Sequence, residues 1–170
     1  MSERNQFLTQ YGHDEHLDDA TKSHVFNIAL ASSQNPSLLP RHIDNLMRSG
    51  EVQVRANAIK HPSATKSQIS DGLDDHEPRV REMAMFNKNA DEDHITKALT
   101  DTSARVRREA TFSPRVNAGH IETIINDKDS GVRLSATANK LTSKEQLKKL
   151  VSDEDEYVGS KAHDRLKGMK

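Results

Sequence analysis

The sequence predicts an all-α solenoid built from short two-helix repeats. Three observations predict it: apolar residues recur every 26 positions, helix-capping residues recur with the same period, and the supply of apolar residues is small. Only 33% of the 170 residues are apolar, and 25 basic residues nearly balance 26 acidic ones. A near-neutral chain with few apolar residues favours many small helix interfaces over one thick core.

The period appears in five aligned columns of residues. They are a valine (Val54, Val80, Val106, Val132, Val158), an alanine four residues later (Ala58, Ala84, Ala110, Ala136, Ala162), two branched positions (Ile69, Ile95, Ile121, Leu147 and Leu73, Leu99, Ile125, Val151) and an aspartate (Asp75, Asp101, Asp127, Asp153). Such recurrence is the signature of a repeat architecture, in which each unit packs on its neighbours.

The first helix of each repeat carries the valine and the alanine, which lie on one face because they are four residues apart. Three residues before the valine stand the helix-capping types Ser103, Asp129 and Asp155, and Pro78 fits the first helical position of its repeat. We therefore expect the first helix to begin shortly before each repeat valine.

The second helix of each repeat begins eleven residues after the valine. Residues that accept hydrogen bonds from a helix start occupy this position, namely Thr65, Asp91, Asn117 and Ser143. Gln68 and Gln146 complete capping boxes, and Pro40 fits the start of an earlier second helix. Helices of about 8–10 residues are too short to persist alone, so stacking must stabilise them.

The domain organisation follows from the columns. Val25 and Ala29 extend the pattern upstream into a first repeat that is three residues longer than the others. We expect a degenerate half-repeat or cap over 1–24, repeats over 25–53, 54–79, 80–105, 106–131 and 132–157, and a capping helix over 158–170.

The string Asp-x-x-x-x-Val-Arg, present at 75–81, 101–107 and 127–133, resembles the signature of HEAT repeats. The short period is similar to that of leucine-rich-repeat-variant and HEAT-like units. The resemblance covers residues 25–170 and implies a right-handed stack of helix pairs whose second helices line the concave side. Proteins of this kind include scaffolds, adaptors, enzyme subunits and DNA-binding proteins, so the fold alone does not define a function.

Composition removes several kinds of chemistry. The chain has no cysteine, which excludes disulfides, thiolate metal sites and iron–sulfur clusters. Since it has neither a membrane-length apolar run nor a signal-peptide pattern at its start, we expect a cytoplasmic protein. It shows no phosphate loop, nucleophile elbow or zinc-protease motif, so we expect no enzymatic activity and no cofactor.

Histidines and phenylalanines receive structural interpretations. His13 and His16 lack further ligands nearby, and a shared repeat column near a helix start holds His42, His94 and His120, so we expect no metal site. Phe86 and Phe112 share another column and are expected in the core.

The arginine column Arg55, Arg81, Arg107 and Arg133 has two interpretations. The favoured one pairs each arginine with a repeat aspartate in a ladder that fixes the stacking of the repeats. The alternative makes this column, with Arg108, a binding site for the nucleic-acid backbone. Near neutrality and a pI near 6.8 count against the alternative.

The favoured function is a protein-binding module, an adaptor, scaffold or inhibitor, whose partner is another protein. Its predicted contact face consists of second-helix residues that point away from the core and vary in charge between repeats: Lys66, Ser70, Glu92, Thr96, Glu122, Lys144 and Lys148. A patterned charged face specifies a partner by complementarity. Neither a membrane nor a small-molecule substrate is expected.

Overall fold

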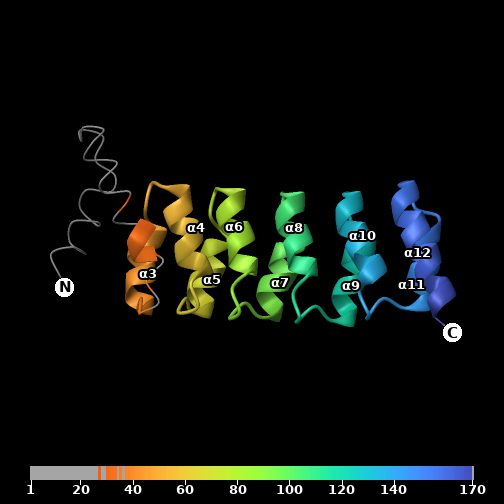
Figure 1. Ribbon diagram of the computed structural model, residues 1–170, viewed down its shortest axis with the longest axis horizontal. Helices are drawn as coiled ribbons and strands as arrows, with labels where there is room; N and C mark the ends of the chain where they lie inside the picture. Colours follow the sequence, from red (N-terminus) through yellow and green to blue (C-terminus); the bar gives the residue numbers. More distant parts are fainter. Residues whose placement is uncertain (1–26, 28–29, 34, 36, 170) are drawn as a thin grey trace. The chain divides into compact units, whose positions relative to one another are not determined.

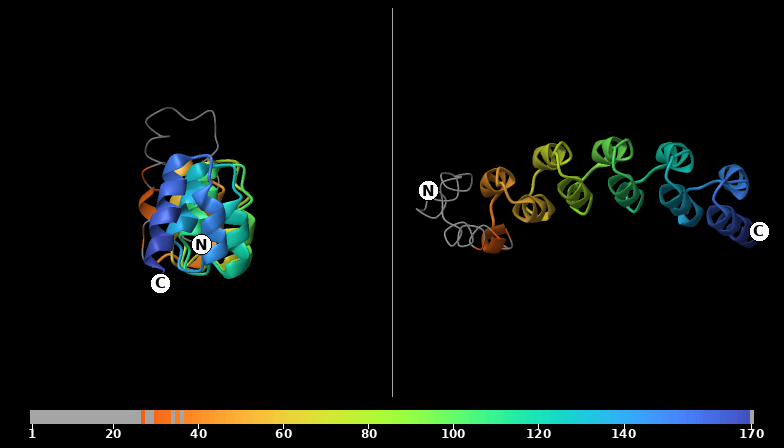
Figure 2. Two further views of the ribbon diagram at one scale, coloured as in Figure 1. Left: turned by 90° about the vertical axis from the view of Figure 1, so that its right-hand side faces the viewer. Right: turned by 90° about the horizontal axis from the view of Figure 1, so that it is seen from above.

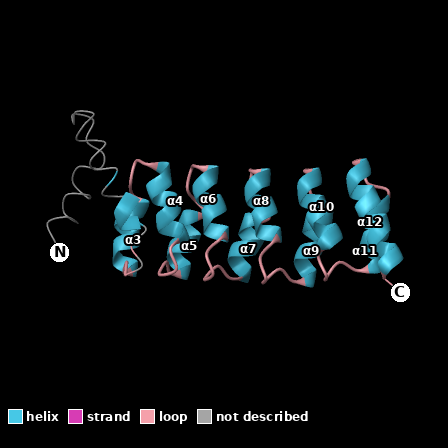
Figure 3. Ribbon diagram, in the orientation of Figure 1, coloured by secondary structure: helices cyan, strands magenta, loops and turns pink. Residues whose placement is uncertain are grey.

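A computed structural model describes residues 27, 30–33, 35 and 37–169, and all regular structure within them is helical (Figures 1 and 3). The predicted half-repeat over 1–24 lies outside these residues. Across the described part of the chain, every helix is too short or too polar to span a lipid bilayer. The chain forms two compact units, residues 1–90 and 91–170, and each is described by itself.

The first unit contains two layers of helices. We call the first helix of a repeat first-type and the second helix second-type. The second-type helices of this unit are α3 (Pro40–Met47) and α5 (Lys66–Gly72), and its first-type helices are α4 (Val52–Lys60) and α6 (Pro78–Met85). Helix α4 packs against α6, while α3 contacts α5 (Figure 2). The fully buried side chains Ile43, Val54, Ile59, Ile69 and Val80 fill the space between the layers.

The second unit repeats this arrangement. Helices α8 (Ala104–Thr111), α10 (Ser130–Ala138) and α12 (Glu156–Gly168) form one layer, and α7 (Glu92–Ala98), α9 (Ala118–Ile125) and α11 (Lys144–Val151) form the other (Figure 2, right). Its core consists of fully buried branched residues from both layers: Ile95, Val106, Ile121, Ile124, Val132, Leu147 and Val158.

The helix starts follow the capping prediction. Thr65, Asp91, Asn117 and Ser143 are all N-caps, and each forms a reciprocal capping box with the residue three positions on. The first-type helices begin two residues before the repeat valine. Asp129 and Asp155 cap them by side-chain hydrogen bonds, whereas Ser103 stands at the N-cap without one. Pro40 and Pro78 occupy the first helical position, as predicted.

The four apolar columns of the repeat are buried, as predicted, with one departure. The valine and alanine columns are buried throughout, and so are Leu73, Leu99 and Ile125. Val151, at the end of α11, is 37% exposed although it occupies the same column.

The expectation that Phe86 and Phe112 lie in the core is wrong. They are 51% and 65% exposed, at the C-caps of α6 and α8. The buried stripe of α8 comprises Val106, Arg107, Ala110 and Thr111. Phe112 follows Val106 by six residues, which turns it about 240° around the helix and away from that stripe. In the first unit, the ammonium of Lys60 lies 5.6 Å from the centre of the Phe86 ring.

Candidate protein-binding surface

Buried arginine–aspartate pairs run along both units. The Arg107 guanidinium donates from Nε to Asp127 Oδ2 at 2.7 Å and from Nη2 to Oδ1 at 2.8 Å. Arg55 with Asp75 and Arg133 with Asp153 repeat this two-bond geometry. Bidentate bonds between ionised partners are the strong and geometrically specific form of this interaction.

The pairs are connected to one another through the backbone. Arg133 Nη1 donates to the carbonyl oxygen of Asp127 at 2.8 Å, while the carboxylate of Asp127 accepts from Arg107. The same aspartate accepts the backbone N–H of Asp129 at 2.8 Å, just before α10. Asp127 therefore ties together a guanidinium of its own repeat, a guanidinium of the next repeat and the turn between them. Asp75 does the same with Arg55, Arg81 and the N–H of Glu77.

The pairing holds the three aspartates in their charged form, since the pKa of each carboxyl lies below its ordinary value. The hydrogen bond from Arg133 lowers the pKa of Asp153, although burial acts in the opposite direction. Burial raises the pKa of Asp127, but the hydrogen bonds from Arg107 and the Asp129 N–H outweigh it and leave that pKa below its ordinary value. The hydrogen bond to Asp127 in turn raises the pKa of Arg107.

The predicted ladder is thus confirmed at Arg55, Arg107 and Arg133, whose side chains are 4–8% exposed. The nucleic-acid alternative required these same guanidinium groups for phosphates, and the structure commits them to aspartates. Arg81 is half-buried and donates to the carbonyls of Asp75 and His76. Arg108 is exposed on α8, separate from the ladder.

A second ladder, which sequence reasoning missed, links successive second-type helices. The capping-box residue at the third helical position bonds to a side chain 24 residues earlier. Gln68 donates to Asp44 at 2.5 Å, His120 Nε2 lies 3.0 Å from Thr96 Oγ1, and Gln146 donates to Glu122 at 3.3 Å. The sequence contained a signal for this ladder: the third position of each second-type helix and the position 24 residues earlier are both polar in every repeat pair.

This second ladder gives structural roles to part of the predicted contact face. Thr96 and Glu122 bond to the next repeat, and Glu92 accepts a hydrogen bond from the Asn117 amide. Lys149 also reaches Glu122, at 3.0 Å. Polar character at these positions is therefore required by stacking as well as by any partner.

Exposure of the predicted contact face is otherwise as expected. The exposed members are Lys66, Glu92, Thr96, Glu122, Lys144 and Lys148, while Ser70 is half-buried. Lys144 and Lys148 lie one turn apart on α11, and neither forms an ion pair or hydrogen bond within residues 37–169. These two cations are the members of the predicted face that stacking leaves free.

The histidines serve as caps. His94 and His120 are buried, and the Nδ1 atom of each accepts the backbone N–H of its own N-cap residue at 3.1 Å. Within the described part of the chain, no three histidine or carboxylate side chains converge as metal ligands would. His13 and His16 lie outside the described residues.

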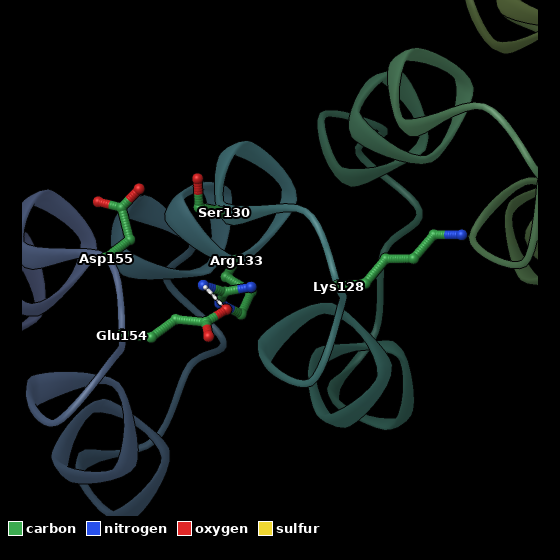
Figure 4. Close-up of a pocket in the computed structure, with 5 residues that line it drawn as sticks. All are labelled: Lys128, Ser130, Arg133, Glu154 and Asp155. Atoms are coloured by element: carbon green, nitrogen blue, oxygen red, sulfur yellow. Dashed lines mark hydrogen bonds and ion pairs between the residues drawn. The ribbon is translucent and has the colours of Figure 1, made fainter.

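A shallow depression lies between the start of α10 and the turn that joins α11 to α12 (Figure 4). Arg133 donates to Glu154 at 3.1 Å across it, and the Ser130 side chain bonds to Asp155. Lys128 points away from the other lining residues. Because its polar groups largely satisfy each other, the depression belongs to the end of the arginine ladder.

The solved structures similar to this chain include two designed armadillo repeat proteins. No protein-family model and no curated protein matches it. Among solved structures it is similar to a designed armadillo repeat protein, YIII(Dq)4CqI, with 17% identity, a TM-score of 0.40, and coverage of 99% of this chain and 100% of the other. A second designed armadillo repeat protein, YIII(Dq.V1)4CPAF in complex with the peptide (KR)4, gives 18% identity and a TM-score of 0.44 at the same coverage.

Proposed function

We propose that this protein is a non-enzymatic module of the HEAT-like kind, an adaptor, scaffold or inhibitor, which binds a segment of another protein. The contact face we assign is the exposed side of α7, α9 and α11 in the second unit. The hydrogen bond between His120 and Thr96 and the one from Gln146 to Glu122 hold these three helices side by side. A partner therefore meets a continuous and ordered surface.

The observation that carries the proposal is the opposite charge at the two ends of this face. Glu92 and Asp93 open α7 at one end, whereas Lys144 and Lys148 stand on α11 at the other. All four side chains are exposed. A surface with separated charges of both signs selects partners by complementarity and excludes those with like charges.

The spacing of the helices sets the expected length of the partner segment. Neighbouring helices pack about 10 Å apart, so α7 and α11 are about 20 Å apart across α9. An extended chain covers that distance with about six residues. We expect a segment whose basic side chains lie over α7 and whose acidic side chains lie over α11.

Fluorescence anisotropy tests this arrangement. The probe is a labelled extended peptide with a lysine pair and a glutamate pair separated by a neutral spacer, and the reference is a peptide of the same composition with alternating charges. The block peptide should bind more tightly than the alternating one. Lys144→Glu with Lys148→Glu should weaken its binding roughly tenfold, since two exposed charge pairs, each worth up to about 1 kcal/mol, are lost.

A matched control separates this effect from net charge. Lys161→Glu with Lys167→Glu makes the same charge change on α12, outside the face, and should leave binding unchanged. Equal binding of the two peptides, or equal effects of the two double variants, would refute the assignment.

A further inference from the structure

The outward side of α8 and α10 exposes apolar side chains that the core does not use. We define the outer patch as Arg108, Phe112, Leu134, Ala138, Lys140 and Leu141. Phe112 is 65% exposed and Leu141 39% exposed, Ala138 is exposed, and Leu134 is half-buried. In the second unit the valine, alanine and first branched columns are fully buried, and Val151 and Tyr157 are exposed outside the patch.

The repeat register brings the members of the outer patch together. Phe112 and Ala138 occupy equivalent positions 26 residues apart, at the ends of α8 and α10, which pack against each other. Leu134 lies one helical turn before Ala138 on the same side of α10. Neighbouring helices are about 10 Å apart, a distance that a phenylalanine side chain largely fills.

Leu141 extends the outer patch into the turn after α10. One of the two equivalent residues in the first unit is Asn89, whose amide donates to the carbonyls of Pro62 and Ala64 at 3.0 and 2.8 Å. A leucine cannot make these bonds, and burial does not compensate for their loss. The turn therefore exchanges a stabilising polar residue for an exposed apolar one.

Two cations flank this apolar strip. Arg108 lies across the start of α10, where its Cδ would be 3.7 Å from a Cβ added at Gly131. Lys140 follows α10 in the turn. Both side chains are exposed, and neither forms an ion pair or hydrogen bond within residues 37–169. On α12 the equivalents of Leu134 and Ala138 are Ser160 and Asp164, which end the strip.

We propose that the outer patch docks an acidic segment of a partner protein that carries aromatic or branched apolar side chains. Exposed apolar groups gain free energy when a partner covers them, and a phenylalanine with a flanking arginine has the composition of an interface centre. Arg108 and Lys140 favour carboxylates at the edge of that contact. The outer patch belongs to the layer of α8 and α10, so this second docking surface is independent of the α7–α9–α11 face.

Titration with defined peptides tests the docking surface on the full chain. The probe is a labelled amphipathic helical peptide with leucines on one side and glutamates on the other. Two reference peptides carry lysine in place of glutamate, or alanine in place of leucine. The probe should bind better than both references, and amide NMR shifts should change at Phe112, Ala138 and Leu141.

Variants then locate the contact. Phe112→Ser and Arg108→Glu should each weaken binding of the probe, the former roughly tenfold, as expected for an aromatic anchor. The matched control is Phe86→Ser, which removes an exposed phenylalanine at the same repeat position of the first unit and should have no effect. All three positions are exposed, so thermal unfolding should be nearly unchanged.

Several outcomes would overturn the proposal. They are equal binding of the three peptides, equal effects of Phe112→Ser and Phe86→Ser, or shifts confined to α7, α9 and α11. If the chain self-associates and Phe112→Ser abolishes that association, the outer patch binds a second copy of this chain and not an acidic partner. If Lys144→Glu with Lys148→Glu does not affect binding of the block peptide, the proposed contact face is wrong but the outer patch is not tested by that result. The two proposals therefore fail separately.

Discussion

The helix pairs α4–α5 and α10–α11 fill the same space in opposite ways. Five residues after the repeat valine, α4 has Ile59 and α10 has Thr137. Eighteen residues after it, α5 has Gly72 and α11 has Leu150. A Cβ added at Gly72 would lie 2.4 Å from Ile59 Cγ1, so the isoleucine fills the place that Leu150 fills in the other pair.

The pair α8–α9 follows the second solution. It has Thr111 on the first helix and Ile124 on the second, both buried. The threonine hydroxyls donate to the carbonyls three residues earlier, Thr111 to Arg108 at 2.7 Å and Thr137 to Leu134 at 2.8 Å. The comparison shows that one large branched side chain fills this space in each pair. The first helix supplies it in α4–α5, and the second helix supplies it in the other two pairs.

The largest expected effect tests what the two pairs share. Arg55→Ala and Arg133→Ala should each lower the free energy of unfolding by about 3–5 kcal/mol, because each leaves a buried aspartate without its partner. Chemical denaturation measures both losses. The ladder would not be the common element if either variant unfolded like the wild type, or if the two losses differed several-fold.

The next effect concerns the part that differs. Gly72→Leu should lower the free energy of unfolding by about 1–3 kcal/mol, because its side chain meets Ile59. Adding Ile59→Thr converts the pair to the arrangement of α10–α11 and should restore much of the loss. A double-mutant cycle with a coupling energy below about 0.5 kcal/mol would show that the two positions do not share one space.

The pH dependence provides a smaller effect in both pairs. The hydrogen bond from Arg133 lowers the pKa of Asp153 below its ordinary value of 3.8. Since the folded carboxylate binds protons less readily than the unfolded one, its contribution is present above pH 3.8 and is lost as pH falls through the lower folded pKa. Thermal unfolding between pH 5 and pH 2 should show this loss, and Arg133→Ala should show less of it. An equal acid dependence in the two proteins would contradict the assignment.

The smallest effect concerns the caps of the second-type helices. Thr65→Ala and Ser143→Ala each remove a side chain that accepts an N–H in a capping box, at α5 and α11. Each should lower the free energy of unfolding by about 1 kcal/mol. The neighbouring exposed changes Ser67→Ala and Glu145→Ala serve as controls and should have little effect. If only one of the two cap variants lowered the free energy of unfolding, the two pairs would differ in their caps as well as in their cores.

Much of the fold could be predicted because the repeat combines independent signals. Periodic valines and alanines predicted the buried face of the first helices, and Thr65 or Asn117 marked the second ones, since capping depends on residues close in sequence. Phe112 was misplaced because hydrophobicity alone does not indicate which side of a helix a residue occupies. Only its angle from Val106 does so.

The site was less predictable, because two of its features depend on residues about 20 positions apart. The pairing of Arg107 with Asp127 could be inferred from opposite charges in two columns, whereas Thr96 and His120 carry no such signal. Their position on the second helices, away from the core, marked Glu92, Thr96 and Glu122 as contact residues. Only the structure revealed their bonds to the next repeat.

The sequence by itself determined the period, the order of helices and the residues that cap them, because these depend on contacts within a few turns of chain. The tertiary structure decided which charges remain free. Lys144 and Lys148 face solvent while Arg107 and Glu122 are engaged, and this depends on distances between helices that no local pattern encodes. It also left Phe112 uncovered by any neighbouring element, so that a partner can reach it.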